Sequence, residues 1–183
     1  MLNRLQSAPR RRQRGSSLVV GLIILILVAI LGVTGMMVAT TQAKQAGNVQ
    51  FQNAAFNNAE GEVSTAASWL YTGNNFRKAG FTAYNSGATP YLYPIDYMAN
   101  NGINPLTMTW TDSNSLAVPA LGTERYIVEK VAAGKVLAGS SLNTGGLSSS
   151  GCKQVDVFRV TAQGTNARGT VKLIQTYNSV LSC

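Results

Sequence analysis

Residues 10–39 read RRRQRGSSLVVGLIILILVAILGVTGMMVA, and this stretch decides the fold of the chain. The 22 residues from Leu18 to Ala39 carry no charge. About 20 apolar residues span the ~30 Å hydrocarbon core of a bilayer, so the segment is long enough to be a membrane helix. By the positive-inside rule, the arginines before it predict a cytoplasmic N-terminal end, with the chain from Lys44 onward across the membrane.

The segment differs from a standard secretory signal in two ways. Its apolar core is longer than the usual ~7–15 residues, and the small residues Gly15, Ser16 and Ser17 precede it instead of following it. A cut at Gly15 therefore leaves the apolar segment on the mature protein.

The charge of the chain is unevenly placed. The formal net charge is +8, but five of the 15 basic residues precede Ser16. The remainder has ten basic and seven acidic residues, or +3. The high pI is therefore mostly a membrane-orientation signal, and nucleic-acid binding is not expected.

The residues available for catalysis are few. The chain has no histidine, which excludes a Ser-His-Asp triad and a His-ligated metal site. The acidic residues are scattered without metal-ligand spacing, so that only folding can bring two of them together: Glu60, Glu62, Asp96, Asp112, Glu124, Glu129 and Asp156. We expect neither an enzyme nor a bound metal or other cofactor.

The two cysteines are Cys152 and Cys183. An even pair fits a single disulfide in an oxidising compartment, in agreement with the predicted topology. Two buried cytosolic thiols are the alternative.

The apolar segment continues without a break into a second helical pattern. Val49, Phe56, Val63 and Leu70 recur every seven residues, with Ala55, Ala59 and Ala66 beside them, which predicts an amphipathic face. We expect one helix over residues 16–71, with residues 18–39 in the membrane and the second half covered by a small domain.

Residues 72–120 form an irregular segment rich in Gly, Asn, Thr, Ser and Tyr. Residues 72–75, TGNN, predict the end of the helix. The aromatic residues around this segment anchor the loop to a sheet or, alternatively, form an exposed adhesive surface: Tyr71, Phe76, Phe81, Tyr84, Tyr91, Tyr93 and Tyr97.

Three strand patterns follow. Residues 124–131 are rich in β-branched and aromatic side chains, and residues 155–162 and 170–177 alternate. In the middle strand Phe158, Val160 and Ala162 share one face, while residues 164–169 read as a turn. We expect an antiparallel meander over residues 124–177 with the helix packed on it, an α+β fold.

A family resemblance is carried by residues 12–20, RQRGSSLVV, in which a basic leader ends in Gly15 before a long apolar helix. This arrangement resembles the class III signal of type IV pilins, and the order of helix, irregular loop, sheet and late cysteines is also similar to a pilin. The chain is more closely similar to minor pilins of the PilX type, through residues 13–23, 46–48, 56–60, 158–164 and 171–177.

The resemblance implies how the chain is processed and divided. A prepilin peptidase is expected to cut between Gly15 and Ser16 and to methylate the new amine of Ser16. The expected parts are a leader over 1–15, the long helix over 16–71, and a pilin head over 72–183 with a variable loop over 72–120.

One position departs from the family pattern. Major pilins usually carry a glutamate at the fifth mature residue, where it pairs with the N-terminal amine of a neighbouring subunit, and here that position is Val20. A subunit without this carboxylate is expected to be tolerated best at the filament tip. Relaxed selection in a low-copy subunit is the alternative.

The resemblance also implies a function. We expect a minor pilin that primes assembly of a type IV pilus at or near its tip, first in the bacterial inner membrane and then at the cell surface. Its expected partners are other minor pilins, the major pilin and the prepilin peptidase. A pseudopilin of a type II secretion system and a signal-anchored periplasmic enzyme or receptor domain are the alternatives.

Overall fold

The computed structural model describes residues 16–118, 124–136 and 154–182. The chain divides into two compact units, Met1–Gly47 and Asn48–Cys183. Helix α1, Ser16–Tyr71, includes residues of both units. Within the described ranges, one helical run, Ser16–Arg77, is long and apolar enough to cross a membrane.

Helix α1 ends where the sequence predicts a stop. Gly73 and Asn74 both take the left-handed conformation, with φ of 58° and 60°. This conformation is common just after a helix because it turns the chain away from the helical path. The Asn75 side chain then donates a hydrogen bond of 2.7 Å to the Trp69 carbonyl, which satisfies an acceptor in the last turn. The short 3-10 helices η1 (Thr72–Arg77) and η2 (Ala79–Phe81) follow.

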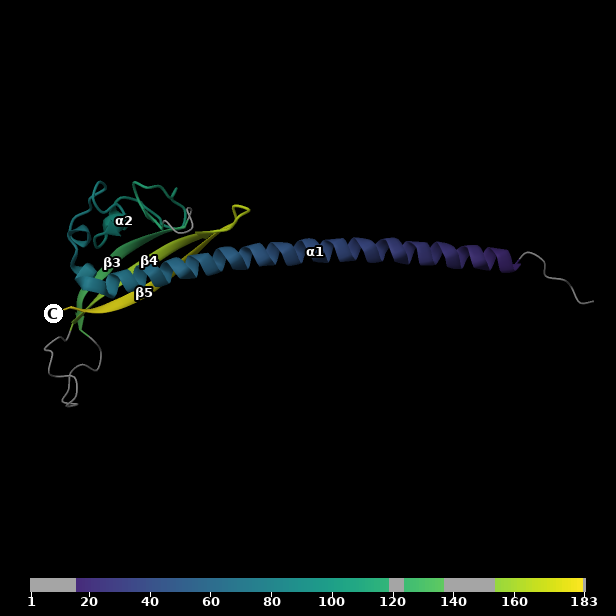
Figure 1. Ribbon diagram of the computed structural model, residues 1–183, viewed down its shortest axis with the longest axis horizontal. Helices are drawn as coiled ribbons and strands as arrows, with labels where there is room; N and C mark the ends of the chain where they lie inside the picture. Colours follow the sequence, from purple (N-terminus) through teal and green to yellow (C-terminus); the bar gives the residue numbers. More distant parts are fainter. Residues whose placement is uncertain (1–15, 119–123, 137–153, 183) are drawn as a thin grey trace, which may run out of the picture. The chain divides into compact units, whose positions relative to one another are not determined.

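The sheet is built mainly from three strands of 12 residues each: β3 (Arg125–Val136), β4 (Gln154–Thr165) and β5 (Val171–Ser182). Their pairings are antiparallel, as expected for the meander. The sheet order is β1-β3-β4-β5, with β2 (Leu116–Ala117) also paired to β3. Strand β1 (Leu92–Tyr93) pairs with β3 in parallel, so the sheet is mixed. The expected α+β, pilin-like fold class is confirmed (Figure 1).

The C-terminal part of α1 packs on the sheet through a narrow face. Its buried residues are Ala55, Ala59, Glu62, Ala66 and Leu70. Gly164 of β4 lies directly beneath this face, where an added Cβ would overlap the backbone of Ala55 and lie 2.8 Å from the Ala59 Cα. Small residues on both elements therefore let helix and strand approach closely.

This close approach corrects two sequence predictions. Val49 and Phe56 were expected to face the sheet, but their exposed fractions are 55% and 45%. The other members of the predicted face do pack: Leu70 is buried and Val63 lies against the core. Near Gly164 the alanines of that face are buried because a bulky side chain does not fit there. Gly164 itself lies in β4 and not in the predicted turn.

The segment between α1 and β3 is held by aromatic packing. Phe76 and Phe81 belong to the core cluster formed with Leu70, Phe158 and Val160. A second cluster forms around Tyr93, Met98 and Ile127, with Tyr84 and Tyr97 packed against it. Helix α2, Tyr97–Asn100, contributes Met98. Most of the aromatic series therefore anchors the loop, whereas Tyr71 is 53% exposed.

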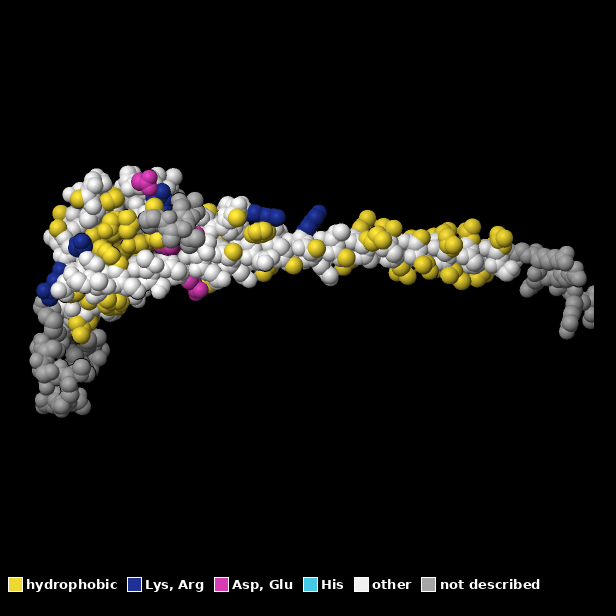
Figure 2. Space-filling model, viewed as in Figure 1, with side chains coloured by type: hydrophobic (Ala, Val, Ile, Leu, Met, Phe, Trp, Pro, Cys, Tyr) yellow, Lys and Arg dark blue, Asp and Glu magenta, His cyan; other side chains and the backbone are white. Residues whose placement is uncertain are grey.

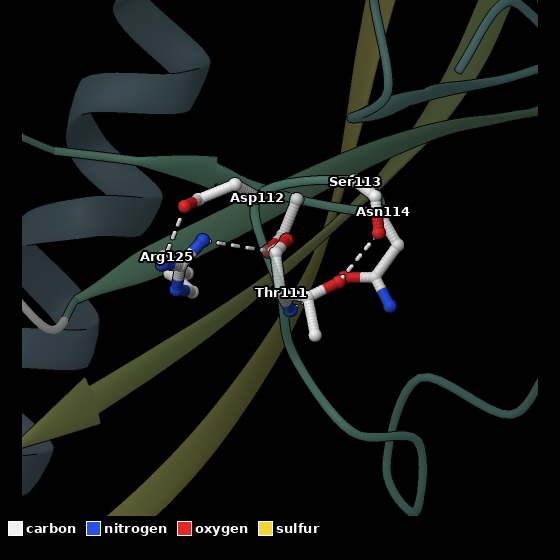
Figure 3. A network of polar contacts seen from close by, with 6 residues as sticks. Thr111, Asp112, Ser113, Asn114 and Arg125 are labelled. Carbon is white, nitrogen blue, oxygen red and sulfur yellow. Dashed lines mark hydrogen bonds and ion pairs between the residues drawn. The ribbon is translucent and has the colours of Figure 1, made fainter. Parts of the chain in front are cut away.

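A polar network ties the last part of this segment to β3. Arg125 forms an ion pair of 2.6 Å with Asp112, and the Asn114 side chain accepts a hydrogen bond from the Thr111 backbone N–H (Figure 3). The Ser115 hydroxyl donates a hydrogen bond of 2.6 Å to the Thr111 carbonyl. These contacts hold the loop in place beside β2 and β3.

Candidate assembly surface

The N-terminal part of α1 is apolar and exposed. Figure 2 shows hydrophobic side chains along this part of the helix. Leu18, Leu25 and Leu31 are at least 70% exposed, and the large apolar residues between them are also exposed. In water such a surface is unfavourable, so it requires lipid or other protein chains around it.

The polar side chains of this segment do not interrupt the apolar surface. The Thr34 hydroxyl donates to the Ile30 and Leu31 carbonyls at 3.0 Å, and the Thr40 and Thr41 hydroxyls donate to the Met37 carbonyl at 2.9 Å. Each hydroxyl thus finds its acceptor within the helix, which removes the penalty for placing it in hydrocarbon.

The part of α1 that belongs to the second unit also has exposed apolar residues. Val49 and Phe56 lie one heptad apart, and neither is covered by the sheet. The Arg168 guanidinium lies 4.1 Å from the centroid of the Phe51 ring, and the Asn166 side chain donates a hydrogen bond of 2.6 Å to the Phe51 carbonyl. The turn between β4 and β5 therefore holds this turn of the helix while leaving Val49 and Phe56 open to another chain.

The predicted processing residues lie at the start of the described chain. Ser16 is the first residue of α1, and Val20 lies one turn further, 52% exposed. Gly15 lies outside the described residues. The proposed cut and methylation involve chemistry by another enzyme, so these remain predictions.

Both cysteines, Cys152 and Cys183, also lie outside the described residues. The register of the neighbouring strands is described, however, and it pairs Gln154 of β4 with Ser182 of β5. Cys152 is thus two residues along the chain from one member of this pair, and Cys183 directly follows the other. The disulfide itself stays a prediction.

Few ionisable groups come together in the head. The described residues contain no group of three or more His, Cys, Asp or Glu side chains able to hold a metal. Lys130 pairs with Asp156 at 2.6 Å, and Arg159 pairs with Glu129, which neutralises two of the buried carboxylates. A hollow of about 340 Å³ beside Tyr84, Tyr93 and Asn114 contains no acid or base.

The sequence analysis missed one pair of acids. Glu62 and Glu124 are 4% and 2% exposed, although charged side chains are seldom buried without a partner of opposite charge. The signal was present in the spacing, because Glu62 falls on the same helical face as Ala55, Ala59 and Ala66.

Three comparisons with known proteins bear on this surface. Residues 14–63 match the family model described as PilX N-terminal. No curated protein and no solved structure matches the chain. The matched range includes the apolar part of α1 together with Val49 and Phe56, so the family match and the exposed apolar surface coincide. The N-terminal segment of this chain is therefore similar to that of PilX-type minor pilins of the type IV pilus.

Proposed function

We propose that this protein is a minor pilin that primes type IV pilus assembly and lies at or near the filament tip. The observation that carries the proposal is the continuous helix α1, whose apolar side chains are exposed from Leu18 to Val38 within the PilX-type match. Anchoring in a membrane requires exposed apolar side chains only over the segment that crosses the bilayer. Val49 and Phe56, beyond the span, favour packing against other helices.

The protein acts by packing and has no chemistry of its own. In the membrane, the arginines at 10–12 and 14 hold the leader in the cytoplasm and the head is on the periplasmic side. Cleavage between Gly15 and Ser16 removes the charged leader. The remaining apolar helix then exchanges lipid contacts for contacts with other pilins as the subunit leaves the bilayer.

Val20 supports a position at the tip. A buried, unpaired carboxylate or amine is costly in hydrocarbon, so a pilin with a glutamate at this position gains by docking beneath a subunit that offers its N-terminal amine. A chain with Val20 has no carboxylate that needs the amine of a subunit above it. Its own Ser16 amine can still pair with the glutamate of the next subunit below. It is therefore suited to the first position in a filament.

Labelling of the head tests the position. A peptide tag in the exposed region around Asn101, followed by gold labelling and electron microscopy of intact pili, should mark filament ends in a few copies. Deletion of the protein should reduce the number of pili far more than their length. Label distributed evenly along the shaft would contradict the tip position.

A paired substitution tests the reason for that position. Val20→Glu restores the carboxylate of major pilins and should shift part of the label from the ends into the shaft. Val19→Glu places the same charge one residue away and serves as the matched control. Equal label distributions for the two variants would contradict the role assigned to Val20.

A further inference from the structure

Two buried carboxyl groups lie in the region where α1 packs beside the start of β3. Glu62 lies on the buried face of α1, and Glu124 directly precedes β3. One oxygen of each group, Oε2, is buried and has no hydrogen-bond partner. The other oxygen of Glu124 accepts a hydrogen bond of 2.8 Å from the side chain of Asn58, which is one helical turn before Glu62 and also donates to the Thr165 carbonyl at 2.6 Å.

The ion pairs of the described sheet and loops involve neither Glu62 nor Glu124. The basic side chains of the sheet and its loops have other contacts: Arg125 with Asp112, Lys130 with Asp156, Arg159 with Glu129, and Arg168 with the Phe51 ring. Residues 119–123, which precede Glu124, are Pro-Ala-Leu-Gly-Thr and carry no charge.

The uncharged neighbours of the pair do not supply a positive charge either. Tyr126 on β3 is 2% exposed, and burial raises the pKa of its hydroxyl well above the ordinary value, as do nearby Tyr91 and Glu62. It is therefore a neutral phenol. Asn58 supplies one donor to Glu124 and none to the free oxygen of Glu62.

Two ionised carboxylates in this position would be strongly destabilising. An uncompensated buried charge costs several kcal/mol, and two like charges close together repel as well. A single proton removes both costs, because a protonated carboxyl donates a hydrogen bond to the free oxygen of its ionised neighbour. We propose that Glu62 keeps its proton in the folded head, donates a hydrogen bond to Glu124, and so forms a pH-sensitive lock between α1 and the sheet.

The direction of the pH dependence follows. Burial raises the pKa of Glu62 above its ordinary value of 4.5, and the charge of Glu124 raises it further. A carboxyl whose pKa is higher in the folded than in the unfolded chain contributes its full stability below the ordinary value, and that stability is lost as the pH rises through the folded value. Between the two values the folding equilibrium constant falls up to about tenfold per pH unit. An exposed carboxylate has no such effect.

The test uses the full chain in detergent micelles, unfolded by urea at a series of pH values from roughly pH 4 to pH 8. Glu62→Gln and Glu124→Gln remove one member of the pair at nearly constant volume, and Glu60→Gln is the matched control, because Glu60 is exposed on the same helix. The unsubstituted chain and Glu60→Gln should lose stability with rising pH in this range. Both pair variants should show a flatter profile.

Difference infrared spectroscopy provides a second measurement. As the pH is lowered through this series, the carbonyl stretch of a protonated carboxyl should appear at a higher pH in the unsubstituted chain than in Glu62→Gln. The band of the unsubstituted chain remains informative if a glutamine variant does not fold.

Three results would overturn the proposal. The first is a pH profile of Glu62→Gln and Glu124→Gln equal to that of Glu60→Gln. The second is a protonated-carboxyl band that appears at the same pH in the unsubstituted chain and in Glu62→Gln. The third is stabilisation of the unsubstituted chain, but not of Glu62→Gln, by added Ca²⁺, which would place a cation and not a proton between the carboxylates.

Discussion

Gly164→Ala tests the close packing of α1 on the sheet. The added Cβ would lie 2.8 Å from the Ala59 Cα and closer still to backbone atoms of Ala55 and Ala59. Carbon atoms in contact are normally about 3.5–4.0 Å apart, so helix and strand must separate by roughly 1 Å. The obstructing atoms belong to the backbone of a helix and cannot rotate away as a flexible side chain would.

The expected loss of folding stability follows from this displacement. Overpacking a close-fitted core costs about 1–3 kcal/mol, whereas replacing a strand glycine gains a few tenths to about 1 kcal/mol through the unfolded state. We therefore expect the free energy of unfolding to fall by about 1–2 kcal/mol. For a unit of this size, that corresponds to a Tm lower by roughly 3–10 °C. Gly164→Val should cost more, since two further methyl groups meet the same helix.

Thermal and urea unfolding of the full chain in detergent micelles measures the effect. The matched control is Gly61→Ala on α1, where an added Cβ meets no atom within 4 Å. In an exposed helix position alanine is more favourable than glycine by about 0.5–1 kcal/mol, so the control should be stabilised. If Gly164→Ala is as stable as the unsubstituted chain, the close approach of α1 to β4 is wrong.

Three other predictions concern the head. Non-reducing peptide mapping should find Cys152 joined to Cys183, and replacement of either by serine should lower stability by about 2–5 kcal/mol; free thiols would contradict the pairing. Asp156→Asn should cost about 1.5–3 kcal/mol at neutral pH. Burial raises the pKa of Asp156, but the hydrogen bonds from Lys130 and the Gly134 N–H outweigh burial and hold the pKa below its ordinary value. The stability that the Asp156 carboxylate contributes is therefore lost as the pH falls. The unsubstituted chain and Asp156→Asn should then become equally stable in acid. A chain beginning at Thr72 should aggregate, because it exposes the sheet face that α1 covers; cooperative melting with unchanged stability would contradict this.

The main elements of the fold were predictable from short-range patterns. Alternation placed Phe158, Val160 and Ala162 on one face of β4, and all three are buried. The sequence TGNN predicted the end of α1, because glycine and asparagine tolerate the left-handed conformation. These signals depend only on neighbouring residues, which a sequence displays directly.

Which side chains of the amphipathic face are buried was not predictable from residue size. The sequence favoured Val49 and Phe56 as buried positions because they are large and apolar, but the partner strand presents Gly164 to the helix. Which side chains of the face are buried depends on what lies opposite, and that is a property of tertiary structure. Glu62 shares the helical face of Ala55, Ala59 and Ala66, so its spacing carried a signal, but an acid on a helix is normally exposed and was not expected in the core.

The candidate assembly surface was predicted in part. The long uncharged run predicted the apolar exterior of α1 directly, whereas the roles of Gly15, Ser16 and Val20 depend on the family resemblance. The parallel pairing of β1 with β3 had no signal, because the two-residue strand Leu92–Tyr93 is too short for any periodicity.

The mature N-terminus tests the central claim most directly. Protein isolated from the membrane and from sheared pili of cells with an active prepilin peptidase can be analysed by mass spectrometry of its first peptide. Processing as a pilin predicts a chain that begins at Ser16 with a methylated amine, and Gly15 replaced by a bulky residue should leave the precursor in the membrane. A chain that begins after Ala39, or one that retains Met1, would contradict a pilin function.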